Sequence, residues 1–413
     1  PSSVLYGSDA VGGTVNVITN RRKDLCSCSW TDGLVSLRGA SGENALFARF
    51  QFEGSRNGIG WLGGLTAKRY GDVVSGGGLL PETGGIEELD GDIRFDKLLS
   101  KRWTLTVAAQ HVGQEDAPRV HRTIHAVPFE GTTRGSELQR DYDQYRDLVY
   151  ARAEYDGGRR AFESASVGVS WHRHEEERDR ERTGDRRDLS GFELHQFGVQ
   201  ARATSCTPIG RLTYGLDWYH DEADTWRRNY VAGVLDSTDI QGPFGDDSRY
   251  DLAGLYVQDE LTFGRFDLVL GGRFTYARAE ADRVEDPVTG DVISVENDWT
   301  RVVGSIRGLY HVSPHWNVYA GAGQTFRAPT LYDLTSFEST SVVETPAPDL
   351  DAEDFLSFEA GVKTRYDDLS GSFVGWYTIL DDTIVRSPTG ALIDGTPEVR
   401  KDNVGDGWVW GLE

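Results

Sequence analysis

The sequence of 413 residues contains no methionine, only 3 cysteines and 13 prolines, and no long apolar segment. A membrane-spanning helix needs about 20 consecutive apolar residues, so the sequence excludes a helical membrane protein. The mean hydropathy of −0.47 does not exclude a membrane β-barrel, because each barrel strand presents only one apolar face. Aromatic residues make up 11% of the chain, which supplies enough apolar surface to exclude wholesale disorder.

Basic residues are also scarce. The chain carries 43 lysines and arginines against 66 aspartates and glutamates, a formal net charge of −23. Nucleic-acid binding needs basic patches that contact phosphates, so nucleic acid is excluded as a partner. In a barrel, this acidity is expected on the loops and on the wall of the lumen.

The three cysteines are Cys26, Cys28 and Cys206. The first two are too close in sequence for an ordinary disulfide, and one distant third cysteine does not complete a four-ligand zinc site. We expect the cysteines to be incidental, with a bridge from Cys206 to either of the others as the alternative. No P-loop, HExxH or GxSxG sequence occurs, so three common signatures of nucleotide binding, zinc proteolysis and serine hydrolysis are absent.

From about Asp32 onward, apolar and polar residues alternate with a period of two. Leu46, Ala48, Phe50 and Phe52, for example, share one face of an extended segment. The same alternation recurs at residues 104–110, 167–172, 266–276 and 357–366. Helical spacing fits these segments poorly, and the pattern predicts β-strands.

The predicted connections alternate in length along the chain. Short connections are predicted at Ser55–Gly58, Leu99–Arg102, Asp156–Arg160, Ser205–Gly210, Gly264–Arg265, Ser313–His315 and Asp367–Leu369. Long polar connections are predicted between them, at Gly71–Glu88, Glu115–Arg140, Glu175–Leu189, Asn229–Arg249, Arg283–Glu296, Ala328–Asp354 and Ser387–Glu398. The first connection, Ala40–Asn44, is short but takes the place of a long loop. If every connection is a hairpin, long loops emerge on one side and short turns on the other, as in bacterial outer-membrane barrels.

This pattern contains about sixteen strands. Outer-membrane transporters with a plugged lumen have about 22 strands, which predicts that roughly six C-terminal strands are absent. The chain begins at Pro1, lacks methionine and stops at Glu413 inside an apolar-patterned segment. We therefore expect a fragment that lacks both ends, with any signal peptide upstream of Pro1.

The opening stretch, PSSVLYGSDAVGGTVNVIT, combines an alternating segment with glycines at Gly7, Gly12 and Gly13. Glycines in this arrangement indicate a tight turn and a close approach of the backbone to its surroundings. The stretch, which includes Tyr6, resembles the end of the plug domain of TonB-dependent outer-membrane receptors.

Two later motifs resemble sequences at the rim of the barrel in the same family. The first, TFRAPTL at residues 325–331, has at its centre Phe326, Arg327, Ala328 and Pro329. The second, APDL at residues 347–350, includes Asp349 and Leu350. It has Ala347 where the family usually has asparagine. No histidine lies between the two motifs. Haem receptors of the family typically carry a histidine there, so haem is less favoured as the ligand.

The resemblance implies an all-β fold, a transmembrane antiparallel β-barrel with about 16 of an expected 22 strands and the C-terminal remnant of a plug domain. Residues 1–24 would be the end of the plug domain and its linker. Residues 25–413 would be an outer-membrane barrel truncated at its C-terminus. The resemblance also implies the outer membrane of a Gram-negative-type bacterium, contact with outer-membrane lipid, and no enzymatic activity.

The function implied by the resemblance is TonB-dependent active transport of a bulky, scarce nutrient, an iron–siderophore or cobalamin. The outer loops and the plug would bind this metal chelate or vitamin, and a change between two plug states would release it inward. The TonB energy-transducing complex would be a partner, through a segment expected upstream of Pro1. A passive porin-type channel, a haem uptake receptor and an outer-membrane hydrolase are the alternatives.

Several residues are candidates for ligand contact, and each has a structural alternative. Arg327 would meet an anionic siderophore, or form an ion pair that closes a loop onto the barrel wall. His121 and His125 in a long outer loop would contact haem iron or another ligand, or be ordinary loop residues. Three aromatic residues and His220, near the outer end of one strand, are predicted to form an interfacial girdle, with ligand contact as the alternative; the aromatic residues are Trp218, Tyr219 and Trp226.

We expect no cofactor, although two places are weak candidates for a metal ion. His172 and His174 share one face of a predicted strand, followed by Glu175–Glu177, and the alternative is a polar strand that faces the lumen. The second candidate is calcium bound by acidic outer loops, although the spacing of the aspartates does not match an EF-hand. The aspartates concerned are Asp236, Asp239, Asp246, Asp247 and Asp251.

Overall fold

The structure is a computed structural model that describes residues 3–8, 14, 19, 29–128, 130–158, 162–336 and 342–413. Most of these residues lie in strands. One sheet contains 18 strands, and a separate two-stranded sheet is formed by β4 (Val74–Ser75) and β5 (Gly78–Leu79). In the part of the chain that is described, no helix has the length and apolar character needed to cross a membrane.

Sixteen long strands form the large sheet, each antiparallel to the next along the chain. They are β1 (Trp30–Ala40), β2 (Ala45–Arg56), β3 (Ile59–Arg69), β6 (Glu87–Leu98), β7 (Trp103–Pro118), β8 (Glu137–Asp156), β9 (Ser164–Arg182), β10 (Arg186–Cys206), β11 (Gly210–Val231), β13 (Asp246–Phe263), β14 (Phe266–Glu285), β15 (Val292–Ser313), β16 (Trp316–Arg327), β18 (Glu353–Arg365), β19 (Ser370–Ile393) and β20 (Thr396–Leu412). Two short strands complete the sheet, β12 (Val234–Thr238) beside β11 and β17 (Val343–Thr345), which pairs in parallel with β20. The predicted number of strands is confirmed.

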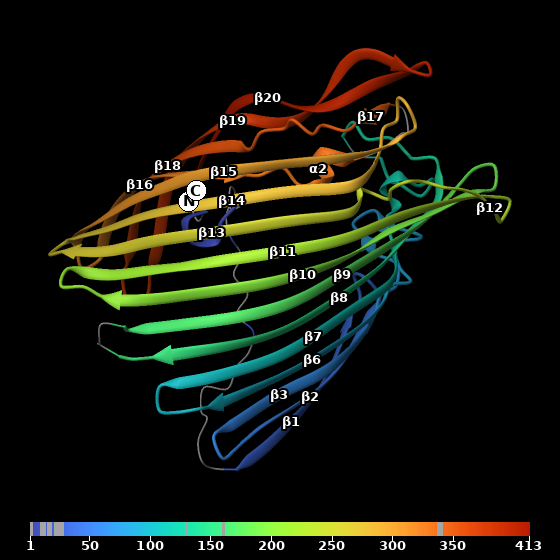
Figure 1. The fold of residues 1–413 in the computed structure, drawn as a ribbon. Helices are drawn as coiled ribbons and strands as arrows, with labels where there is room; N and C mark the ends of the chain where they lie inside the picture. The colour runs from blue at the N-terminus through green and yellow to red at the C-terminus, as the bar shows by residue number, and fades with distance from the viewer. Residues whose placement is uncertain are drawn as a thin grey trace.

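Pairing between consecutive strands makes the sheet a meander that curves into a deep trough (Figure 1). At one edge β1 pairs with β2, and at the other β20 pairs with β19 and β17. Within the described ranges, no pairing joins β1 to β20. Three short helical segments accompany the sheet: α1 (Ser3–Tyr6), η1 (Val120–Arg122) and α2 (Leu331–Thr335).

Side chains alternate between the two faces of the sheet, as the period of two predicted. Along β14, Leu270 and Phe274 lie on one face and are 39% and 43% exposed. Arg273 and Thr275 lie on the other face and are 2% and 1% exposed. We call the first the outer face and the second, which α1 contacts, the inner face.

Apolar residues continue across the outer face from strand to strand. Phe274 pairs with Leu255 on β13 and with Val302 on β15, and Leu255 pairs with Leu216 on β11. These neighbours are 58%, 71% and 41% exposed, respectively. A broad exposed apolar band of this kind is what lipid covers in an outer-membrane barrel.

The helix α1 lies against the inner face, within the trough (Figure 1). Val4 is 3% exposed, and a Cβ added to Gly271 of β14 would stand 2.8 Å from Val4 Cγ1. Gly7 has a φ of +86°, and a Cβ there would stand 3.2 Å from Nη2 of Arg273. Close approach therefore favours glycine at position 271, whereas at Gly7 the main reason for glycine is the positive φ.

Most of the predicted plug end falls outside the described residues. The groups concerned are Gly12, Gly13 and the side chain of Tyr6, and Cys26 and Cys28, beyond the predicted plug end, also fall outside the described residues. The predicted boundary at residue 24 and a bridge to Cys206 therefore stay predictions. The Cys206 thiol donates a hydrogen bond of 3.3 Å to the carboxylate of Glu163.

The short connections lie where the sequence predicted them, and the loops β3–β6, β7–β8 and β16–β18 are long as expected. Three other predictions of long loops, at Glu175–Leu189, Arg283–Glu296 and Ser387–Glu398, are wrong. The strands continue through most of these segments, so that the residues between them are only 183–185, 286–291 and 394–395.

These errors have one physical cause. Beyond the bilayer both faces of a strand contact water or polar groups, so the alternation of apolar residues disappears while the backbone ladder continues. One local signal was present in the sequence. Asp394 and Gly395 have φ values of 49° and 82°, which is the type I′ hairpin turn that an Asp-Gly pair favours.

We predict that Leu255→Arg destabilises the protein in phospholipid vesicles. Arginine on the lipid face costs about 2–4 kcal/mol at the bilayer midplane and less toward either interface. Gln258→Arg is the matched control, because Gln258 lies on the inner face of the same strand and contacts Glu260. Equilibrium unfolding in denaturant should show a clear loss of unfolding free energy for Leu255→Arg. For the control, the unfolding free energy should change by no more than about 1 kcal/mol. Equal losses would show that the outer face is not the lipid face.

Candidate functional site

The loop between β16 and β18, residues 328–352, begins at the first of the two rim motifs and ends at the second. We call it the rim loop. Phe326, at the end of β16, is 1% exposed, and the chain then turns into α2. The side chain of Thr330 caps α2 by accepting a hydrogen bond from the Asp333 backbone, while the Asp333 carboxylate accepts one from the Thr330 backbone. This reciprocal capping fixes the direction of the short helix.

Apolar residues hold the rim loop onto the wall of the sheet. Leu334 is 1% exposed and belongs to a cluster that includes Phe326, Ala279 of β14 and Trp299 of β15. Trp299 Nε1 also donates a hydrogen bond of 2.9 Å to the carbonyl of Leu350. Small inner-face residues on β14 leave the room that the loop occupies, so packing density fixes its position.

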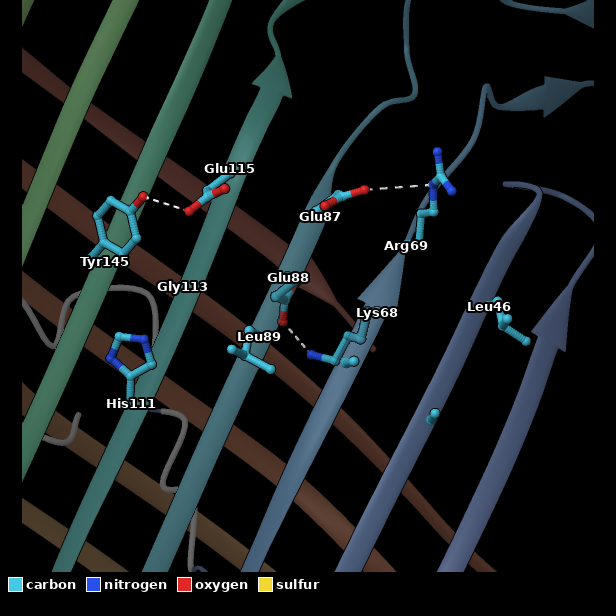
Figure 2. Close-up of a pocket in the computed structure, with 12 residues that line it drawn as sticks. Leu46, Lys68, Arg69, Glu87, Glu88, Leu89, His111, Gly113, Glu115 and Tyr145 are labelled. Atoms are coloured by element: carbon cyan, nitrogen blue, oxygen red, sulfur yellow. Dashed lines mark hydrogen bonds and ion pairs between the residues drawn. The ribbon is translucent and has the colours of Figure 1, made fainter.

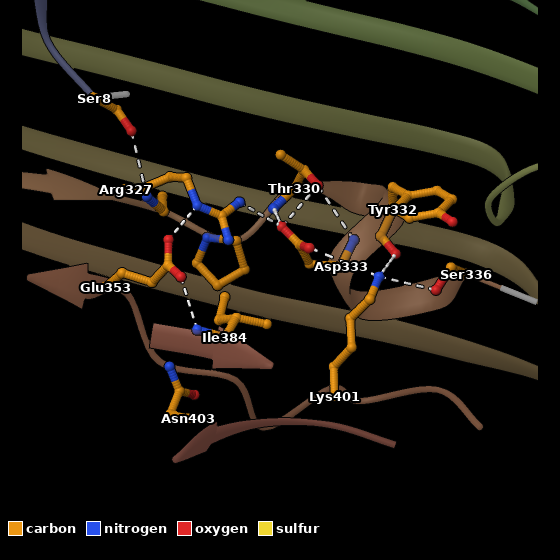
Figure 3. A network of polar contacts seen from close by, with 12 residues as sticks. Ser8, Arg327, Thr330, Tyr332, Asp333, Ser336, Glu353, Ile384, Lys401 and Asn403 are labelled. Atoms are coloured by element: carbon orange, nitrogen blue, oxygen red, sulfur yellow. Dashed lines mark hydrogen bonds and ion pairs between the residues drawn. The ribbon is translucent and has the colours of Figure 1, made fainter. Parts of the chain in front are cut away.

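Arg327 lies at the centre of an ion-pair network beneath the rim loop (Figure 3). Its guanidinium donates to Glu353 of β18, and to the Asp333 carboxylate over 2.7 Å. Glu353 also accepts a hydrogen bond of 2.7 Å from the backbone N–H of Ile384 in β19. Burial raises the pKa of Asp333, but the hydrogen bonds from the Thr330 backbone and from Arg327 outweigh it and hold the pKa below its usual value. The network therefore joins β16, α2, β18 and β19.

Lys401 of β20 extends this network from the other side of the loop (Figure 3). Its ammonium donates to the carbonyl of Tyr332 over 2.8 Å and to the hydroxyl of Ser336 over 3.0 Å. Burial lowers the pKa of Lys401, against the opposing effect of Asp333 and Glu344. Glu344 of β17 is 1% exposed, and it pairs with Arg386 and accepts a hydrogen bond from Ser336. The rim loop is thus tied to β19 and β20 as well.

The second motif is fixed by polar contacts to β15. Asn297 donates hydrogen bonds of 2.8 and 3.0 Å to the carbonyls of Pro348 and Leu350. Ala347 is 2% exposed within the apolar cluster, whereas the Asp349 side chain is 89% exposed and stands 3.3 Å from Arg400.

The plug-like end contacts the first motif directly. The Ser8 hydroxyl accepts a hydrogen bond of 3.3 Å from the backbone N–H of Ala328, one residue beyond Arg327 (Figure 3). Gly7 lies against Arg273, which pairs with Asp217 of β11 over 2.9 Å. The segment inside the trough is therefore connected to both the wall and the rim loop.

The sequence left two hypotheses for Arg327, contact with an anionic siderophore or a structural ion pair. The structure places Arg327 in an ion pair. Contact with an anionic ligand stays a prediction. The three predicted aromatic residues do not lie together. Trp218 is on the outer face, 40% exposed and stacked on His220, whereas Tyr219 is on the inner face beside Gln200.

Trp226 lies further along β11, where the guanidinium of Arg228 stands 5.0 Å from its ring. His121 belongs to η1 and is exposed, and the backbone of His125 donates to Thr123 over 3.2 Å. Both histidines lie in the β7–β8 loop, as predicted. Ligand contact by any of these residues stays a prediction.

His172 and His174 lie on the inner face of β9 with ring centroids 6.5 Å apart. His172 Nε2 accepts a hydrogen bond of 2.8 Å from Arg146, and His174 packs edge-on against Phe192. In the described ranges, no group of three or more histidine, cysteine, aspartate or glutamate residues is arranged to hold a metal ion. A metal site at this pair stays a prediction.

Three of the acidic residues proposed for calcium have partners within the protein. Asp246 accepts a hydrogen bond of 2.9 Å from the Thr225 backbone, and Asp239 one of 2.7 Å from Asn229. Asp251 stands 2.9 Å from His220. Bound calcium stays a prediction.

A groove of about 530 Å³ lies on the outer face of β2–β8 (Figure 2). Its apolar floor includes Leu46 and Leu89, and its polar margin includes His111 and Tyr145. Tyr145 donates a hydrogen bond of 2.9 Å to Glu115. Because this groove opens away from α1, we interpret it as part of the boundary between the lipid-facing band and the polar extension of the strands.

Sequence reasoning missed one group of charged residues. Arg178, Arg180 and Arg182 alternate with other polar residues at the end of β9, so a strand places all three on the inner face. Their segment was predicted as a loop, which concealed that shared face.

The family model described as TonB dependent receptor-like, beta-barrel, matches residues 36–413. The chain belongs to the TonB-dependent receptor family. The family and the similar solved structures are receptors and transporters rather than enzymes, and the receptor belongs to the outer membrane.

The receptor is 23% identical over 353 residues to an iron-regulated outer membrane virulence protein of Vibrio cholerae serotype O1 (strain ATCC 39541 / Classical Ogawa 395 / O395). The match covers 81% of this chain and 48% of that protein, so the chain spans about half the length of the curated relatives it matches. The structure is similar to that of the copper transporter OprC, with a TM-score of 0.75, 16% identity, and coverage of 95% of this chain and 59% of that one. It is also similar to the ferric yersiniabactin uptake receptor FyuA from Yersinia pestis, with a TM-score of 0.69, 16% identity, and coverage of 100% and 61%. These two structures show the fold.

We predict that Glu353→Gln loosens the rim loop of the receptor. Removing one charge of a mostly buried pair leaves Arg327 with a single carboxylate partner, which costs about 1–3 kcal/mol of local stability. Amide hydrogen exchange should quicken in residues 328–336 and 342–352. Glu359→Gln is the control, because Glu359 lies on the same strand and pairs with the half-exposed Arg307. If the two variants exchange alike, the Arg327 network does not hold the loop.

Proposed function

We propose that the receptor takes up a bulky, scarce nutrient across the outer membrane by TonB-dependent active transport, with an iron–siderophore chelate or cobalamin as the ligand. The observation that carries this proposal is the position of α1 inside the trough. Val4 packs on the inner face, and Ser8 bonds to the rim loop. A segment inside the trough contacts both the wall and the loop, which is what a plugged transporter requires.

This position argues against a passive channel. An open pore needs a lumen lined by polar side chains and filled with water. Here Val4 and Gly271 make an apolar contact, and Arg273 is buried between α1 and β13. Displacing this segment therefore costs free energy, so passage requires an input from elsewhere.

The names of similar proteins support metal uptake. One is iron-regulated, one is a copper transporter, and one takes up a ferric siderophore. These are properties of those proteins, and for this receptor they favour a metal chelate over other nutrients.

In the proposed mechanism, the plug has two states with different affinity for the ligand. A ligand held tightly by one state is released only if an external input favours the other state. TonB would supply that input. The described contacts that such a movement would break first are the Ser8–Ala328 hydrogen bond and the packing of Gly7 on Arg273.

Purified receptor tested against iron chelates, cyanocobalamin and haem should bind one of them tightly. The same preparation in planar bilayers should conduct ions poorly. Steady conductance without tight binding of any of these ligands would support a passive channel instead. Tight binding of haem alone would favour a haem receptor.

We predict that Gly7→Val makes the receptor leaky. Valine at a φ of +86° costs about 1–2 kcal/mol, and its side chain would meet Arg273. Displacement of α1 should raise ion conductance and the sensitivity of cells to a large hydrophilic antibiotic. Gly42→Val is the control, because a Cβ at Gly42 meets nothing within 4 Å. Unchanged conductance in Gly7→Val would show that this segment does not close the lumen.

A further inference from the structure

A single charged residue interrupts the apolar band on the outer face of β13. Asp259 pairs with Leu270 on β14 and with Leu212 on β11, so its side chain lies on the outer face. On β11, β13, β14 and β15, the outer-face residues from the strand ends at the short turns up to Tyr276 and the residues paired with it carry no other charge. A carboxylate at this place is therefore an exception that needs a physical reason.

Asp259 lies well within the band. β13 ends at Phe263 beside a short turn, and the next charged row of the outer face, toward the loop side, is formed by Asp251 and Arg278. From Asp251 to Phe263 the strand covers about 40 Å, which at a tilt of about 45° spans about 28 Å, close to the expected apolar band of about 25 Å. By the same measure, Asp259 lies about 9 Å inside the edge of the band at the short-turn side.

The carboxylate of Asp259 has no partner in the described part of the chain. Its Oδ1 atom is buried and accepts no hydrogen bond there. The cross-strand neighbours, Leu212 and Leu270, have no side-chain donor to offer. An unpaired carboxylate in apolar surroundings costs free energy, and a cation beside it lowers that cost. An ionisable residue at membrane depth thus indicates a functional site with a partner.

An apolar groove of about 750 Å³ lies next to Asp259 on the same face; we call it the band groove. It crosses the wall from β9 to β15, and its apolar lining includes Leu216, Leu255, Phe274 and Val302. Gly272 of β14 leaves the floor open, because a Cβ there would meet nothing within 4 Å. Gly272 pairs with Val257, the outer-face position next to Asp259 on β13.

The order of these two features along the strand matches a lipid molecule. Asp259 is nearer the short turns, and the band groove lies further toward the middle of the band. A lipid in the leaflet at the short-turn side has the same order, with its headgroup near the edge of the band and its acyl chains toward the middle. The groove offers apolar side chains to an acyl chain, and Asp259 offers a charge to the headgroup.

The charge of Asp259 selects the headgroup. A primary ammonium carries a positive charge and donates several hydrogen bonds, which suits a carboxylate without partners. An anionic headgroup would instead place a phosphate beside the carboxylate with no cation between them. A hard metal ion takes about six to eight oxygen ligands or keeps most of its water, and one aspartate on an apolar face supplies too few.

We propose that the receptor binds one phospholipid with a primary amine headgroup, phosphatidylethanolamine being the simplest, on the outer face of β13 and β14. The ammonium donates to the carboxylate of Asp259, and one acyl chain occupies the band groove. The bound lipid neutralises the only charge on this part of the wall and fills the space that Gly272 leaves. The site lies on the opposite face of the sheet from α1, so it is separate from the transported ligand.

The first test measures lipid binding to receptor that is purified from outer membranes and stripped of lipid in detergent. The probes share their acyl chains: phosphatidylethanolamine, its N-acetyl derivative, which lacks the positive charge, and phosphatidylglycerol. Titration followed by native mass spectrometry should show phosphatidylethanolamine bound about tenfold more tightly than the other two, because it alone makes the charge-assisted hydrogen bond. Equal affinity for all three lipids would overturn the inference.

Asp259→Asn removes the charge and keeps the shape of the side chain. It should lower the affinity for phosphatidylethanolamine to that for phosphatidylglycerol. Asp267→Asn is the matched control, because Asp267 lies on the inner face of the adjacent strand β14 and stands 2.8 Å from His311. The control should keep the affinity within about twofold. A preference for phosphatidylethanolamine that survives in Asp259→Asn would reject Asp259 as its origin.

Gly272→Phe tests the band groove. The added ring should fill it and weaken binding of both phosphatidylethanolamine and phosphatidylglycerol severalfold, while the preference between them remains. Gly371→Phe is the control, because Gly371 lies on the outer face of β19, where a Cβ meets only Thr364, at 3.6 Å. Melting temperatures show whether both variants fold, and Asp259→Asn tests the site without added bulk. Unchanged affinity in a folded Gly272→Phe would show that no acyl chain lies in the groove.

The same measurements separate a lipid from a protein partner and from the proposed function. If another membrane protein covers this face, the stripped receptor will not distinguish the three lipids, and the inference fails. Asp259→Asn should leave binding of the transported ligand unchanged, because Asp259 and α1 lie on opposite faces. Loss of ligand binding in a folded Asp259→Asn variant would contradict this separation.

Discussion

Every backbone N–H and C=O group that enters the hydrocarbon of a membrane must find its hydrogen bond within the protein, and this constraint governs the whole chain. Sixteen long strands meet this constraint by pairing each with the next, except at the free edge of β1 and along most of the free edge of β20 in the described part of the chain, and this ladder fixes the order and direction of the segments. The pleat then divides side chains between an apolar outer face and a polar inner face. Leu255 and Phe274 lie on the apolar outer face for the same reason that Arg273 faces α1.

The polar inner face creates a second requirement, because charges taken out of water need partners. Arg327 has Glu353 and Asp333, and Arg273 has Asp217, so these pairs fix the rim loop and support the segment inside the trough. Asp188 of β10 likewise contacts Arg178, Arg180 and Arg182 at the end of β9.

The length of the strands explains how the wall of the sheet supports the rim loop. β11 and β15 each contain 22 residues, which at about 3.3 Å per residue is far longer than the apolar band of about 25 Å. The excess extends beyond the bilayer on the loop side, where the rim loop folds inward against β14 and β15. The wall therefore continues beyond the apolar band on the loop side, where it supports the rim loop.

The sequence by itself determined the number of long strands, most of their short connections, the apolar face of the sheet and the two rim motifs, because a period of two and turn residues act locally. It also placed Tyr6 and Gly7 in a family motif. Tertiary structure decided the rest. Whether Arg327 pairs with Glu353, 26 residues away, depends on which strands lie side by side. The shared face of Arg178, Arg180 and Arg182 became visible only once β9 was seen to continue as a strand, because pairing with β8 and β10 extends it through a segment whose side chains carry no apolar alternation.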